Sequence, residues 1–88
     1  MFIQENNRFY MGDKSKPQAE VTFVSLGDDE LSIDHTFVDN SLRGQGLAQK
    51  LVDAVADFAR SEGKKLSATC PYAAKRLETD EKYADIAK

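Results

Sequence analysis

Residues 43–48 read Arg43-Gly44-Gln45-Gly46-Leu47-Ala48, and they lie between a segment of alternating polar and apolar residues and a segment of helical periodicity. Glycine allows backbone angles and close approaches that a Cβ would obstruct, and the first N–H groups of a helix have no intrahelical partner. A diphosphate can accept those hydrogen bonds, and Arg43 adds a local positive charge. Because two glycines are also typical of an ordinary strand-to-helix turn, the flanking elements must decide between these interpretations.

The residues before the loop predict an antiparallel meander of strands. Residues 18–24 and 30–38 alternate with the period of two that is typical of half-buried strands, and Gly27-Asp28-Asp29 predicts a hairpin turn between them. A short aromatic-rich strand is expected over residues 8–11, closed by a turn or loop over residues 12–17. Alternation along the strand before the glycine loop predicts one face with Leu31, Ile33, His35 and Phe37, and the other with Ser32, Asp34 and Thr36.

The residues after the loop predict an amphipathic helix. Apolar side chains recur at helical spacing from Leu47 through Leu51 and Val55 to Phe58. Gly63 follows where a left-handed residue commonly ends a helix. The glycine loop therefore precedes the best-supported helix of the chain.

A second strand and further helical segments are expected beyond this helix. Residues 66–70 form a short strand, so that strand, helix and strand make a β-α-β unit with parallel strands and a right-handed crossover. Pro71 can begin a second helix with residues 72–77 as its body, and Thr79 or Asp80 can cap a last segment that ends near residue 86. The predicted fold class is α+β: an antiparallel meander, then a β-α-β unit, with helices packed on the sheet.

The composition limits the classes of function. The 88 residues, 41% apolar and 31% charged, predict one folded domain over residues 1–88. The net charge of −3 argues against a general nucleic-acid binder. One cysteine and one histidine exclude an intrachain disulfide and predict no metal site. The N-terminus resembles no signal peptide and no stretch is long and apolar enough for a membrane span, so we expect a cytoplasmic location. We also expect a monomer or weak dimer.

The loop lacks the lysine and hydroxyl that end a P-loop, and it lacks the third glycine of a dinucleotide fingerprint. Arg43, Gly46 and Ala48 instead match the Arg/Gln-x-x-Gly-x-Gly/Ala signature, and the chain resembles the GCN5-related N-acetyltransferases over residues 18–77. The segment Cys70-Pro71-Tyr72 after the second parallel strand is similar to the small, single-domain members of that family.

This resemblance implies that the chain binds acetyl-coenzyme A (acetyl-CoA). Main-chain groups of the strand end would pair with the pantetheine arm, and the amides of the loop would hold the pyrophosphate. The chain departs from full-length members because it lacks the N-terminal helices that wall the acceptor site and the closing C-terminal strands. The expected cofactor-binding residues are Phe37, Val38, Arg43, Gly44, Gln45, Gly46, Leu47 and Ala48.

Three residues are candidates for chemistry. Cys70 ends the second parallel strand, and its thiolate could accept an acetyl group, although free cysteine is often merely buried. His35 could deprotonate Cys70 or an incoming amine, although a lone histidine in an apolar row is more often a core residue. Tyr72 could give a proton to the departing CoA thiolate, or could simply pack. Asp34 and Asp39 are lesser candidates for the base.

Three functions follow from these features. The first is transfer of an acetyl group from acetyl-CoA to an unknown amine, directly or through Cys70. The second is a non-catalytic acetyl-CoA or CoA-binding module, which acts as a sensor or carrier. The third is a small interaction domain in which the glycine loop is only a turn.

Overall fold

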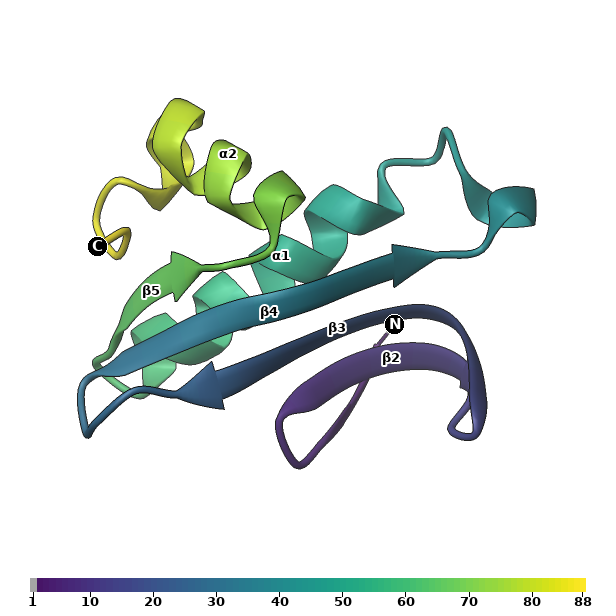
Figure 1. Ribbon diagram of the computed structural model, residues 1–88, viewed down its shortest axis with the longest axis horizontal. Helices are drawn as coiled ribbons and strands as arrows, with labels where there is room; N and C mark the ends of the chain where they lie inside the picture. Colours follow the sequence, from purple (N-terminus) through teal and green to yellow (C-terminus); the bar gives the residue numbers. More distant parts are fainter. Residues whose placement is uncertain (1) are drawn as a thin grey trace.

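The alternating N-terminal half forms most of a five-stranded sheet in the computed structural model, which describes residues 2–88 (Figure 1). The strand order is β1-β2-β3-β4-β5; the first four strands are antiparallel, and β4 and β5 are parallel. The predicted α+β class and the parallel pair are confirmed. The strands are β1 Ile3–Glu5, β2 Arg8–Asp13, β3 Lys16–Ser25, β4 Glu30–Val38 and β5 Lys65–Ala68, and the helices are α1 Leu47–Ser61 and α2 Pro71–Thr79.

The hairpins differ in how well the sequence predicts them. β4 has the predicted bounds, and the turn before it closes with a 2.9 Å hydrogen bond from Leu26 N to Glu30 O. Of the turn or loop predicted over residues 12–17, the structure has a turn, which is tight because both strands extend into this range and Asp13 pairs with Lys16. The Asp13 carboxylate accepts the Ser15 backbone N–H at 2.9 Å and stabilises this turn. β1 was not predicted, because three residues are too short to show a period.

α1 covers one face of the sheet, behind β3 and β4 in Figure 1. Its predicted apolar stripe is buried against the sheet, where it meets Phe9, Phe23 and Leu31. Each fully buried leucine or valine of this stripe contributes about 1.5–3 kcal/mol through removal of apolar surface from water. The helix ends as predicted, with Gly63 at a φ of 67° and a 2.9 Å hydrogen bond from Lys64 N to Ala59 O. No helix among residues 2–88 has the length and apolar character that crossing a bilayer requires.

A β-bulge in β4 changes which side chains face α1. Thr22 of β3 pairs with His35, whereas the next residue, Phe23, pairs with Ile33, so Asp34 is an extra residue on the β4 side. The extra residue reverses the alternation beyond it. The prediction that His35 and Phe37 share a face with Leu31 and Ile33 is therefore wrong. Thr36, which pairs with the buried Val21, faces α1 instead.

β5 is shorter than the predicted strand over residues 66–70. Its pairing with β4 ends at Ile33 and Ala68, and the N–H groups of Thr69 and Cys70 both donate to the Ile33 carbonyl, at 2.9 and 3.2 Å. Pro71 then begins α2, as predicted, because its missing N–H is not needed in the first turn. β4 thus continues past the point where β5 leaves it.

The C-terminal residues close the other edge of β5. Leu66 N donates to Ile86 O at 2.7 Å and Lys88 N donates to Leu66 O at 2.9 Å, so this end of the chain lies beside β5 like a short parallel strand. Of the two predicted caps, Asp80 is the one that precedes the short 3-10 turn Glu81–Tyr83, and its carboxylate accepts from Lys82 N.

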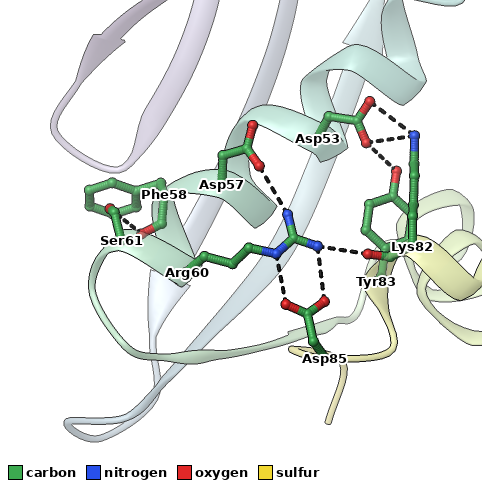
Figure 2. Close-up of polar contacts among 8 residues, drawn as sticks. All are labelled: Asp53, Asp57, Phe58, Arg60, Ser61, Lys82, Tyr83 and Asp85. Carbon is green, nitrogen blue, oxygen red and sulfur yellow. Dashed lines mark hydrogen bonds and ion pairs between the residues drawn. The ribbon is translucent and has the colours of Figure 1, made fainter.

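Side chains fasten this C-terminal segment to α1 (Figure 2). Arg60 donates from Nε and Nη2 to the Asp85 carboxylate, at 2.9 and 3.0 Å, and from Nη2 to the Lys82 carbonyl at 2.7 Å. The buried Tyr83 hydroxyl donates to Asp53 at 2.6 Å. We call Asp53, Arg60, Tyr83 and Asp85 the C-terminal clamp. The clamp joins α1 to the C-terminal segment that pairs with β5.

Candidate active site

A cavity of about 430 Å³ lies where β4 and β5 separate. Residues 34–38 of β4 extend beyond the last pairing with β5, and α2 begins on the other side of the gap. The glycine loop and the first turn of α1 complete the walls. The residues that line it are Thr36, Phe37, Val38, Leu42, Arg43, Gly44, Gly46, Leu47, Ala48, Gln49 and Tyr72.

The glycine loop leaves its main chain open toward this cavity. Gly44 and Gly46 have φ values of 87° and 72°, a left-handed conformation that side chains with a Cβ rarely adopt. A Cβ built on either glycine meets no atom within 4 Å, so the space beside both is open. The first hydrogen bond of α1 runs from Lys50 N to Gly46 O, and the amides of the three residues before Lys50 precede any intrahelical acceptor. This arrangement fits a bound anion.

A 3-10 turn, Asn40–Leu42, leads from β4 into the loop. The Asp39 carboxylate accepts from the N–H and hydroxyl of Ser41, and these bonds lower the pKa of Asp39 below its ordinary value. Asp34, the other carboxylate considered as a base, accepts from the Thr22 hydroxyl at 2.5 Å. Both carboxylates therefore have structural roles, in a turn and at the bulge.

The end of β4 supplies one main-chain wall. Phe37 and Val38 pair with β3 on one side and line the cavity on the other. A strand that has lost its neighbour can pair with an extended molecule inserted in that neighbour's place. Of the eight residues predicted to bind the cofactor, seven line the cavity; Gln45 does not.

Cys70 does not line the cavity itself but contacts Thr36, which does. It is the N-terminal cap of α2, is 9% exposed, and its Sγ lies 3.4 Å from the Thr36 hydroxyl. Burial raises the pKa of the Cys70 thiol, but hydrogen bonds from Thr36 and from the amides of Ala73 and Tyr72 together outweigh burial, so the net pKa is lowered. Tyr72, 39% exposed, lines the cavity beside Cys70.

His35 lies on the other face of the sheet. Adjacent residues of a strand point to opposite faces, and Thr36 is the residue that faces Cys70. The His35 side chain is 54% exposed, with Nε2 3.9 Å from a carboxylate oxygen of Glu20 on β3. The structure thus brings Tyr72 to the cavity, places Cys70 behind Thr36, and does not bring His35 to Cys70.

Two contacts at this site were not predicted from the sequence. Thr36 was assigned to the face opposite its true one, and Glu20 was not considered as a neighbour of His35. Neither has a signal in the sequence, because the bulge that turns Thr36 inward and the register that sets Glu20 near His35 both depend on pairing between strands.

Comparison with known proteins agrees with this arrangement. The family model for GCN5-related N-acetyltransferases matches residues 8–86. The whole chain matches 87% of the NMR solution structure of a GCN5-like candidate N-acetyltransferase from Staphylococcus aureus, with 37% identity and a TM-score of 0.86. Among curated proteins, none matches the sequence.

Two longer structures share the fold. A ribosomal-protein-alanine N-acetyltransferase from Brucella melitensis is 25% identical over 92% of this chain and 62% of its own, with a TM-score of 0.62. A Mycobacterium tuberculosis protein in complex with CoA is 18% identical over 70% of this chain and 40% of its own, with a TM-score of 0.60. From the signature loop, the sheet that opens beside it and the match over residues 8–86, the chain belongs to the GCN5-related N-acetyltransferase family.

Proposed function

We propose that residues 1–88 form one domain that binds acetyl-CoA in this cavity and transfers its acetyl group to an amine through Cys70. The observation that carries the proposal is that the loop with open amides borders the same cavity as Tyr72 of α2 and Thr36, whose hydroxyl contacts Cys70. The amides of residues 44–48 would hold the pyrophosphate beside Arg43. The main chain of Phe37 and Val38 would pair with the pantetheine arm.

The acetyl donor supplies an activated thioester, and the chain supplies a nucleophile. Cys70 Sγ forms a bond to the acetyl carbon as the bond from that carbon to the CoA sulfur breaks. The Tyr72 hydroxyl supplies the proton that the departing sulfur needs. The amine then attacks the acetyl group on Cys70, the bond from the acetyl carbon to Sγ breaks and the Cys70 thiolate is regenerated. The proton that the amine loses returns through solvent to Tyr72 and restores its hydroxyl. Burial raises the pKa of the Cys70 thiol, and the groups that lower it are Thr36 and the amides of Ala73 and Tyr72; His35 is not among them.

His35 fits a different role. It is exposed on the face of the sheet opposite α1, and Glu20 lies near its Nε2. An amine that approached from that face would meet His35 rather than Cys70, and His35 would take its proton in a direct transfer. The direct and the two-step routes therefore use different residues, which makes them separable by mutation.

A test of the proposed function starts with the intact chain and acetyl-CoA alone. We expect mass spectrometry to show one added acetyl group, located on Cys70, and none in Cys70→Ala. Both forms should bind CoA equally, as measured by calorimetry. If the parent chain binds acetyl-CoA but Cys70 is not acetylated, the two-step route is overturned. Loss of acetyl transfer to an amine pool in His35→Asn would then support the direct route.

The second function is a CoA-binding module without turnover. The observation that favours it is the exposed sheet face around His35, where residues 2–88 supply no helix to enclose an acceptor. This function predicts saturable binding of acetyl-CoA with neither acetylated Cys70 nor loss of thioester in any amine mixture. An NMR titration that shifts residues 37–48 and 70–76 locates the site under either function.

A further inference from the structure

The β-bulge at Asp34 decides which side chain of β4 faces Cys70. Without the extra residue, the alternation that starts at Leu31 would turn His35 toward α1. With it, Thr36 pairs with Val21 on the face covered by α1. The bond from the Thr22 hydroxyl to Asp34 joins the bulge to β3.

Thr36 is placed between the cavity and the sulfur. Its side chain lines the cavity, and its Oγ1 lies 3.4 Å from Cys70 Sγ. A β-branched side chain is stiff about χ1, so the position of the hydroxyl is well defined. A hydroxyl can both accept and donate a hydrogen bond, whereas a thiolate can only accept. The same contact can therefore serve the thiol and, with the donor reversed, the thiolate.

We propose that Thr36 is a positioning residue for Cys70: it holds the sulfur at the cavity wall and donates a hydrogen bond to it when it is ionised. The purpose of this role rests on the proposed function, in which Cys70 is the nucleophile. The contact itself is present without any substrate. A hydrogen bond to the charged form of a group favours that form. The direction of the Cys70 pKa agrees with this, since Thr36 is the largest of the contributions that lower it.

The test measures the rate of Cys70 alkylation by iodoacetamide against pH, on the whole chain and without CoA. Thr36→Val keeps the branched shape and removes the hydroxyl. We expect its thiol pKa to rise by about half to one unit, so that alkylation near neutral pH slows about 3- to 10-fold. Thr36→Ser restores the hydroxyl and should recover most of the rate. Thr79→Val, at the far end of α2 where the hydroxyl donates to the Lys75 carbonyl, is the matched control and should titrate like the parent chain.

An unchanged thiol pKa in Thr36→Val, or no recovery in Thr36→Ser, would overturn the proposal. If circular dichroism shows that Thr36→Val does not fold, Thr36→Ala, which removes the hydroxyl without putting a methyl group in its place, is measured instead. An unchanged alkylation profile in Thr36→Ala overturns the proposal. Because iodoacetamide needs no acetyl donor, a Thr36 effect without acetylated Cys70 refutes the proposed transfer alone.

Discussion

Polar groups are unpaired at the N-terminal end of α1 and paired toward its C-terminal end. At the N-terminus, the first amides have no intrahelical acceptor, and the space beside Gly44 and Gly46 is open. Toward its C-terminus, the C-terminal clamp pairs Arg60 with Asp85 and Tyr83 with Asp53 (Figure 2). Paired groups add stability, whereas unpaired groups at a surface are available to a ligand. The comparison predicts that changes at the clamp alter stability and that changes at the loop alter binding.

The largest expected effect is the loss of the buried ring in the clamp. Tyr83 is 1% exposed, so Tyr83→Ala leaves a cavity and removes one of the hydrogen bonds to Asp53. We expect the free energy of unfolding to fall by about 3–5 kcal/mol, measured by urea denaturation. Tyr72→Ala, which removes a half-exposed ring beside the cavity, should lower it far less. Equal losses in the two variants would contradict the division between the ends.

Gly46→Val is expected to weaken acetyl-CoA binding about a hundredfold, equivalent to about 2.7 kcal/mol. A valine disfavours the left-handed φ and occupies the space beside the open amides. Calorimetry measures the affinity.

Gly27→Val is its matched control. Gly27 has a φ of 73° and equally open surroundings, but it lies in the hairpin before β4. It should lose similar stability and keep the affinity. Weakened binding in both variants would mean that strain, rather than the loop's position, explains the loss.

Removal of the Tyr83 hydroxyl alone should have a smaller effect. Tyr83→Phe keeps the ring and breaks the 2.6 Å bond to Asp53, and we expect a loss of about 1–2 kcal/mol in the free energy of unfolding. Affinity for acetyl-CoA should stay the same. Tyr10→Phe, at another buried tyrosine on β2, is the control for the substitution itself.

The smallest effect is the pH dependence of the ion pair in the clamp. Arg60 lowers the pKa of Asp85 through hydrogen bonds, so this carboxylate is more acidic in the folded chain than in the unfolded one. The contribution of this carboxylate to stability is full above the pKa that it has in the unfolded chain. It is lost as pH falls through the pKa that it has in the folded chain. Between about pH 6 and about pH 3, the free energy of unfolding should fall less in Asp85→Asn than in the parent chain. Identical slopes would show that the exposed pair contributes nothing, as many surface pairs do.

The sequence predicted the elements around the cavity better than the contacts inside it. The spacing of apolar residues and the position of the glycines were sufficient to predict β4, α1 and its end at Gly63, because these features depend on near neighbours in the chain. Seven of the predicted cofactor-binding residues line one cavity for the same reason, since six of the eight are consecutive in the sequence. Their binding of acetyl-CoA stays a prediction.

The amino-acid sequence by itself determined that a glycine loop follows a strand and begins a helix, which is a local property of residues 43–48. The tertiary structure alone decided which side chain meets Cys70. One extra residue in β4, opposite Thr22 and Phe23, turns Thr36 inward and His35 outward. Such a bulge is set by the register between two strands, and a one-residue change in register moves every later side chain to the other face.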